Sequence, residues 1–131
     1  MAIVCGTDLS EGSLDALTVA IAVARRRGDA QLFLVHVLDP ATGHDDSARE
    51  SLAKSARERI EADAARLAAG TGVAVKTEVM MGPPAATLLA FAETEGAELV
   101  VVSSKGHTNS PIYRIGGTSE QIAQDSTMPV L

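Results

Sequence analysis

The sequence predicts an α/β fold in which an open, Rossmann-like sheet of five parallel strands carries helices on both faces. Short apolar runs, typical of buried strands, alternate with segments of helical periodicity along the chain, in the order βαβαβαβαβ. Each link between consecutive strands is long enough for a helical crossover, which is the connection that parallel strands require. The length of 131 residues fits one domain, and we expect residues 1–131 to form a single domain.

Two strands and a helix with clear end signals are predicted in the first third of the chain. The apolar runs AIVCG at 2–6 and QLFLVHVL at 31–38 predict the first and second strands. Between them Ser10 is a typical N-cap, and apolar residues recur after it at helical spacing. Gly28 suits the position just after a helix, and the arginines before it suit the negative end of the helix dipole.

A surface helix and a third strand are predicted next. Ser47 and Glu50 form a capping box, so we expect Ser47 to cap a helix that ends at Gly70. Residues 73–80 alternate between apolar and polar types, which predicts a strand with one exposed face at an edge of the sheet. The apolar face of the helix is predicted to contain Leu52, Ala56, Ile60 and Leu67.

The last third of the chain is predicted to repeat the alternation. Two prolines at 83–84 suit the first turn of a third helix, and Gly96 stops it. The run ELVVV at 98–102 predicts the fourth strand. A short helix at 119–126 and the beginning of a fifth strand, MPVL at 128–131, complete the pattern.

The composition argues against several classes of function. The net charge of -6, from 17 acidic and 11 basic residues, argues against nucleic acid as a partner. With two Phe, one Tyr and no Trp, the chain has little material for a base-stacking platform. No apolar run approaches the roughly 18 residues of a membrane span, so no membrane partner is expected. An anionic small ligand stays compatible with this charge, because amides and one or two cations can hold a phosphate.

The single cysteine and the start of the chain predict a cytoplasmic protein. Cys5 lies in the first apolar run, where a buried strand thiol is expected, and it has no second cysteine to pair with. Met1 leads directly into strand-like sequence, without the basic region or cleavage site of a signal peptide.

A long polar loop, SSKGHTNSPIYRIGGTSEQ at 103–121, separates the fourth strand from the last helix. Loops of this length are uncommon inside compact domains and are often functional. In open α/β sheets, ligands bind beyond the carboxyl ends of the strands, where the strand order reverses. The candidate site is therefore assembled from the loops after the first, second and fourth strands.

Three stretches of the chain resemble the universal stress protein family. IVCGTDLSEGSLDAL is similar to the first strand and turn of these proteins, and LVHVLDP is similar to their second strand. The end of the chain, from SSKGH to PVL, resembles their closing glycine loop, helix and strand. The resemblance covers the whole chain and implies an adenine nucleotide alpha hydrolase-like fold. It also implies a regulatory module of the stress response that binds ATP or AMP.

Nucleotide-binding members of that family carry the pattern G-x-x-G-(nine residues)-G-[ST]. The matching positions here are Ser103, Gly106, Gly116 and Gly117, with nine residues between Gly106 and Gly116. Ser103 replaces the first glycine and Gly117 replaces the hydroxyl residue, which predicts weakened rather than abolished binding. An alternative register pairs Gly117 with Thr118 and makes the loop one residue longer. The ungapped register is preferred because it also places Ser119 and Glu120 where the family has a Ser/Thr-Glu pair.

The resemblance also implies where a nucleotide would lie. Asp8 would sit near the ribose and could hold Mg²⁺ when ATP is bound, and the Thr7 and Val37 backbones would border the adenine. Glycine amides and the helix that starts near Ser119 would face the phosphates, with Lys105 as a cation. The full predicted site is Gly6, Thr7, Asp8, Val37, Val102, Ser103, Lys105, Gly106, Gly116, Gly117, Thr118 and Ser119.

Two further functions stay open: a dimeric interaction module of the same fold without nucleotide, and a slow ATPase. We expect that this protein is not an enzyme and has no catalytic residues, because its sequence contains no Ser-His-Asp order, no paired catalytic carboxylates and no Walker loop. His44, Asp45 and Asp46 include metal-ligand types, but their place in a polar loop favours a solvated loop over a metal site. His36 is expected to be a hydrogen-bonded core residue, and His107 would lie near the phosphates.

The final strand also predicts self-association. MPVL is apolar and lies at the end of the predicted sheet, and an open apolar edge invites a second chain. In the resembled family this strand commonly pairs with its copy across a two-fold axis. Pro129 has no N–H to donate, so pairing would use Met128, Val130 and Leu131. We expect a concentration-dependent homodimer.

Overall fold

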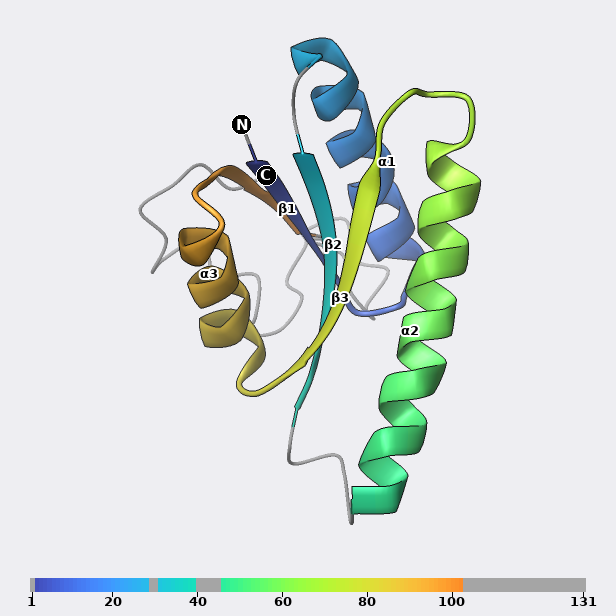
Figure 1. Ribbon diagram of the computed structural model, residues 1–131, viewed down its shortest axis with the longest axis vertical. Helices are drawn as coiled ribbons and strands as arrows, with labels where there is room; N and C mark the ends of the chain where they lie inside the picture. Colours follow the sequence, from blue (N-terminus) through green and yellow to red (C-terminus); the bar gives the residue numbers. More distant parts are fainter. Residues whose placement is uncertain (1, 29–30, 40–45, 103–131) are drawn as a thin grey trace.

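The structure is a computed structural model, and it describes residues 2–28, 31–39 and 46–102. Strands and helices alternate along this part of the chain, as the sequence predicts (Figure 1). The elements are β1 (Ala2–Thr7), α1 (Glu11–Arg27), β2 (Gln31–Leu38), α2 (Asp46–Ala68), β3 (Val75–Met81), α3 (Pro84–Thr94) and β4 (Ala97–Val101).

The described strands form one parallel sheet in the order β3-β2-β1-β4. Helices α1 and α2 cover one face of this sheet, and α3 covers the other (Figure 1). The predicted α/β architecture, with parallel strands and helices on both faces, is confirmed for these elements. The predicted last helix at 119–126 and fifth strand at 128–131 lie outside the described residues.

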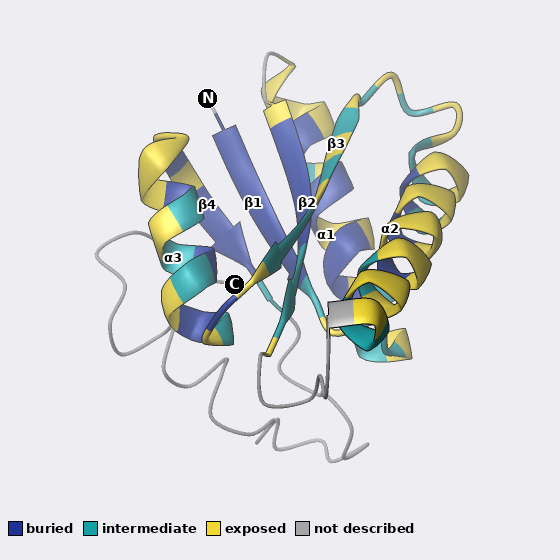
Figure 2. Cartoon of the chain, turned by 60° about the horizontal axis from the view of Figure 1, so that its bottom comes forward, coloured by how far each residue is buried: buried dark blue, intermediate teal, exposed yellow. Residues whose placement is uncertain are grey.

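The core consists of two layers that meet at β1. Ile3, Val4 and Cys5 have 0% of their surface exposed. Figure 2 shows β1 coloured as buried between the layers. Ile3 and Cys5 pack with α1 and α2, whereas Val4 packs with α3, because successive side chains of a strand point to opposite faces. Cys5 is therefore the buried strand thiol that the sequence predicts, and burial raises its pKa to about 12.

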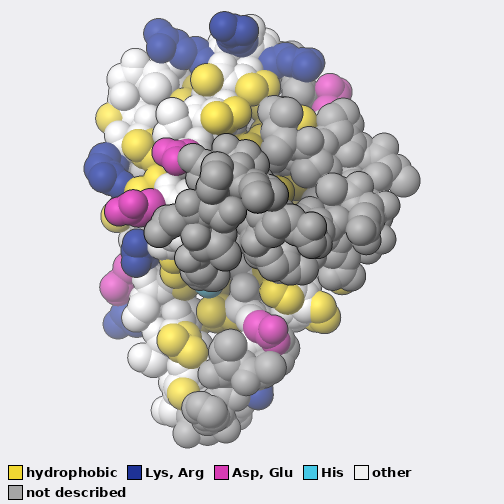
Figure 3. Space-filling view, turned by 180° about the vertical axis from the view of Figure 1, so that it is seen from behind, with side chains coloured by type: hydrophobic (Ala, Val, Ile, Leu, Met, Phe, Trp, Pro, Cys, Tyr) yellow, Lys and Arg dark blue, Asp and Glu magenta, His cyan; other side chains and the backbone are white. Residues whose placement is uncertain are grey.

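Helix α1 begins and ends where the local signals predict. The Ser10 hydroxyl accepts a hydrogen bond from the Ser13 N–H at 3.3 Å, and the Gly28 N–H donates to the Ala24 carbonyl at 3.1 Å. Gly28 has a φ of 76°, a conformation that favours glycine. Arginines 25–27 are exposed at this end, and Lys and Arg side chains gather at the same end of the molecule (Figure 3).

Helix α2 departs from the prediction in two ways. It already includes Asp46, so Ser47 lies inside the helix and the predicted cap at Ser47 is wrong. Leu52 is 44% exposed rather than part of the buried face, because the first turns of α2 extend beyond the sheet (Figure 1). Ala56 and Ile60 are buried as predicted. No helix of the described residues is long and apolar enough to cross a membrane.

The third strand lies at an edge of the described sheet, as its alternating sequence predicts. β3 pairs with β2, and side chains that are half-buried alternate with exposed ones along most of it. It begins at Val75, two residues later than predicted. Helix α3 then starts with Pro84 in its first turn, and Gly96 follows its end with a φ of 66°.

We expect the Cys5 thiol to be unreactive in the folded protein. A buried thiol with a pKa near 12 stays protonated at neutral pH, and the thiolate is the species that attacks disulfide reagents. An aromatic disulfide reagent should label Cys5 in the native chain no faster than the rate at which the protein unfolds far enough to expose it. The same reagent in strong denaturant should label one thiol per chain at once. Rapid labelling of the native protein would contradict the burial of β1.

Candidate functional site

The strand order places a topological switch point between β1 and β4. The chain runs from β1 to β2 and β3 on one side, and then returns to place β4 on the other side of β1. Ligands of open α/β sheets bind beyond the carboxyl ends of the strands at such a point. Cys5 pairs with Val101, so the residues that follow the two strands lie side by side. The predicted loops after β1 and β4 therefore begin next to each other.

A short turn, Thr7 to Ser10, links β1 to α1 at this point. The Asp8 carboxylate oxygen Oδ1 accepts hydrogen bonds from the Ser10 N–H at 2.9 Å and from the Ser13 hydroxyl at 2.5 Å. The Asp8 N–H in turn donates to the Ser13 hydroxyl at 2.9 Å. Ser13 is 3% exposed, so the two bonds to its hydroxyl are partly shielded from water, whereas the bond from the Ser10 N–H is exposed. The carboxylate is thus held in one orientation at the first turn of α1, where the positive helix end favours a negative charge.

Leu9 in this turn has a φ of 68°, which is unusual for a residue with a side chain. Such a conformation costs about 1 kcal/mol or more and persists where neighbouring groups hold it. Here the Leu9 N–H donates to the Thr7 hydroxyl at 3.0 Å, and the Leu9 carbonyl accepts from Arg59 Nη2 at 2.9 Å. Arg59 belongs to α2, so a helix from elsewhere in the chain fixes the turn. Sequence reasoning missed Arg59, because nothing in its local pattern distinguishes it from other exposed arginines.

His36 holds the other end of the turn. Its ring nitrogen Nδ1 lies 2.8 Å from the Thr7 carbonyl oxygen, and since a carbonyl can only accept, Nδ1 carries the proton. His36 is half-buried on the α1 and α2 side of the sheet, so the prediction of a hydrogen-bonded residue is confirmed, although it lies at the border of the core. The next residue, Val37, is half-buried and packs on the α3 side.

Position 6 has little room for a side chain, because α3 and the residue after β4 pack closely against it. A Cβ atom at this position would lie 2.7 Å from Leu88 Cδ2 and 3.3 Å from Val102 Cγ1. The end of β1 therefore packs closely against α3 and against the residue that follows β4. The structure thus gives Gly6 a packing reason and brings Gly6, Thr7, Asp8 and Val102 to the same end of the sheet.

The predicted phosphate-binding part of the site lies outside the described residues. It comprises Ser103, Lys105, Gly106, Gly116, Gly117, Thr118 and Ser119. His44, Asp45 and His107 lie outside them as well. Within the described ranges, no group of three or more metal-ligand side chains comes together.

Comparison with known proteins identifies the family. The sequence profile of the Universal stress protein family matches residues 1–131. The chain is 31% identical to Universal stress protein MJ0531 of Methanocaldococcus jannaschii, over 98% of this chain and 79% of that protein. It is also 31% identical to Universal stress protein YxiE of Bacillus subtilis, over 96% of this chain and 91% of that protein. The chain belongs to the universal stress protein family.

Solved structures share the fold over nearly the whole chain. Hypothetical protein MJ0577 of Methanocaldococcus jannaschii aligns with a TM-score of 0.84 and 25% identity, over 99% of this chain and 92% of that one. A universal stress protein in complex with cAMP aligns at 0.66 with 24% identity, over 100% and 94% of the two chains. One from Archaeoglobus fulgidus in complex with dAMP aligns at 0.68 with 20% identity, over 100% and 95%. At these identities the last two comparisons show a common fold.

We expect Ser13→Ala to lower the free energy of unfolding by about 1–2 kcal/mol, since its hydroxyl bonds to both the carboxylate and the N–H of Asp8. The matched control is Thr18→Ala, on the same helix, whose hydroxyl donates to the Leu14 carbonyl on an exposed face. That change should stay within about 0.5 kcal/mol of the wild type. Urea denaturation measures both. Equal values for the two variants would show that the Asp8 bonds do not stabilise the turn.

Proposed function

We propose that this protein is a regulatory module that binds an adenine nucleotide, ATP or AMP, at the carboxyl ends of β1 and β4. The observation that carries the proposal is the Asp8 turn at the switch point. A carboxylate held by the Ser10 N–H and the Ser13 hydroxyl is already oriented before a ligand arrives, so little ordering is required on binding. Family membership and two structural neighbours, one in complex with cAMP and one with dAMP, support the same ligand class.

In this proposal each end of the nucleotide meets a different part of the site. Asp8 faces the ribose and, with ATP, contributes an oxygen ligand to Mg²⁺. The Thr7 and Val37 backbones border the adenine, and Gly6 and Val102 form the floor between the two strands. The phosphates meet the loop after β4, through Lys105 and the amides of the predicted glycine pattern.

We infer binding rather than turnover. The Cys5 thiol is buried and protonated, and Nδ1 of His36 is engaged with the Thr7 carbonyl, so both groups serve the scaffold. Binding modules of this kind report or store a nucleotide, and a change in occupancy would be their signal. A slow ATPase would need a group that activates water near the phosphates; His107 is the candidate there, and no sequence pattern marks it as a base.

A second candidate is an interaction module of the same fold that binds no nucleotide. The two departures from the family pattern, Ser103 and Gly117, favour it. Under both proposals, the homodimer through residues 128–131 and the cytoplasmic location stay predictions from the sequence.

We expect ATP and AMP to bind with micromolar or weaker affinity, measured by isothermal titration calorimetry. Asp8→Asn should weaken binding about tenfold. The amide oxygen of asparagine can still accept from the Ser10 N–H and the Ser13 hydroxyl, so the turn stays while the charge is lost. An unchanged melting temperature of Asp8→Asn is the control for the fold. If neither ATP nor AMP gives heat at about millimolar concentration, and neither competes with the other for the protein, the module without nucleotide is favoured.

The double variant Ser103→Gly and Gly117→Ser should bind ATP more tightly than the wild type. It restores both positions of the family pattern in the ungapped register, removing a side chain beside the base or ribose and adding a hydroxyl at the phosphates. A titration under the same conditions as for the wild type measures the change. Weaker binding by the double variant would show that the ungapped register is wrong.

A further inference from the structure

The outer edge of β3 is open along its whole length in the described part of the chain. β3 pairs with β2 on one side, and no described strand lies on the other. An edge strand presents a row of backbone N–H and C=O groups that can pair with another strand. β3 spans seven residues, which is long enough for a ladder of several hydrogen bonds.

The sequence of this edge is complementary to itself. Residues 75–79 read Val-Lys-Thr-Glu-Val, so reversing the direction exchanges lysine with glutamate and leaves the other positions unchanged. In an antiparallel pair centred on Thr77, Lys76 lies opposite Glu78 of the partner subunit, and Glu78 lies opposite Lys76 of the partner subunit. Opposite charges and β-branched residues directly across two strands stabilise the pair. We propose that β3 pairs with β3 of a second copy of this chain about a two-fold axis through Thr77.

The burial of β3 fits this arrangement. Lys76 and Glu78 are exposed and point to one face of the sheet, while Val75, Thr77 and Val79 are half-buried on the face that α2 covers. Pairing would therefore place both ion pairs on one face of the sheet. The other face would have two contacts between Val75 and Val79 and one contact between the two copies of Thr77. The Lys76 ammonium lies 5.8 Å from the centre of the Phe33 ring, and its long stem can turn from the ring to a carboxylate across the edge.

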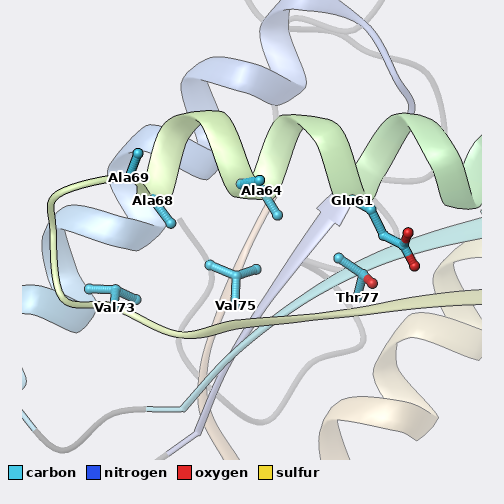
Figure 4. A pocket seen from close by; sticks show the side chains of 8 residues that line it. Glu61, Ala64, Ala68, Ala69, Val73, Val75 and Thr77 are labelled. Atoms are coloured by element: carbon cyan, nitrogen blue, oxygen red, sulfur yellow. The ribbon is translucent and has the colours of Figure 1, made fainter.

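A groove between α2 and β3 provides space for the second copy. It has a volume of about 350 Å³, and Ala64, Ala68, Val75 and Thr77 point into it (Figure 4). Its lining is mostly alanine and valine with a single carboxylate, Glu61, so it lacks the several convergent polar groups that fix a small ligand. A groove lined mainly by small residues allows a close approach of another protein segment.

The spacing of the layers also fits two copies. α2 packs on both β2 and β3, so in a continuous sheet it and its symmetry copy would lie about two strand spacings apart, or about 10 Å. Helices pack at about this distance, and alanines 65 and 69 along the groove leave room for it. Glu61 lies near Thr77, so its two copies would face each other and keep the association reversible (Figure 4).

Charge reversals at β3 test the proposal by sedimentation from about 10 µM to about 1 mM. Lys76→Glu and Glu78→Lys each place like charges opposite one another, so each should weaken self-association about tenfold or more. An equimolar mixture of these two variants should associate again, because every pair across the edge is then opposite in charge. The double variant, Lys76→Glu with Glu78→Lys, should restore association by itself.

Two controls distinguish pairing through β3 from a loss of folding and from pairing through the final strand. The melting temperature of each variant at low concentration should match the wild type within a few degrees, since the exchanged side chains are exposed. Val130→Asp, added to every variant, removes the pairing predicted for the final strand, and the same pattern should remain. A wild type that is monomeric at about 1 mM would overturn the proposal. So would single variants that associate like the wild type, single variants that fail to associate when mixed, or association that Val130→Asp abolishes.

Discussion

The burial of β1 is the constraint on which the rest of the structure depends. This strand pairs with β2 on one edge and β4 on the other, and its side chains join the apolar layers on both faces. Residues 2–6 of the strand are buried and therefore apolar, and polar side chains begin only at its last residue, Thr7, and at Asp8. The position of the candidate site is therefore a consequence of where the core stops.

The Asp8 turn connects this core to three other elements. Ser13 of α1 holds the carboxylate, His36 of β2 holds the Thr7 carbonyl, and Arg59 of α2 holds the Leu9 carbonyl. None of these bonds is large alone, since a net hydrogen bond contributes about 1 kcal/mol. Together they keep a strained residue in place and orient a charge at the switch point. A site held by several elements can bind a ligand with little reorganisation, which lowers the free-energy cost of binding.

Features that depend on residues close together in the sequence could be predicted, whereas features that depend on residues far apart could not. The cap at Ser10 and the glycine end at Gly28 depend on neighbouring residues, and both predictions are confirmed. The edge position of β3 in the described sheet was predictable because the exposed face of an edge strand leaves an alternating pattern in its own sequence. The cap at Ser47 was wrong because α2 starts earlier, and Leu52 is exposed because the sheet ends before the helix does. The bonds of His36 and Arg59 join residues 29 and 50 positions apart, and no local pattern contains them. The predicted glycine loop rests on family resemblance.

The long reach of these bonds also determines when the turn can form during folding. Helix α1 can begin at Ser10 from its own sequence, but the Thr7 and Leu9 carbonyls acquire their partners only after β2 has paired and α2 has docked. Contacts between distant parts of a chain form slowly, because the intervening segment must first be ordered. The bonds that hold the Thr7 and Leu9 carbonyls therefore need β2 and α2 in place, so the turn cannot be complete before these elements are. A chain that ends at β2 lacks Arg59, so it cannot form the bond that holds the Leu9 carbonyl.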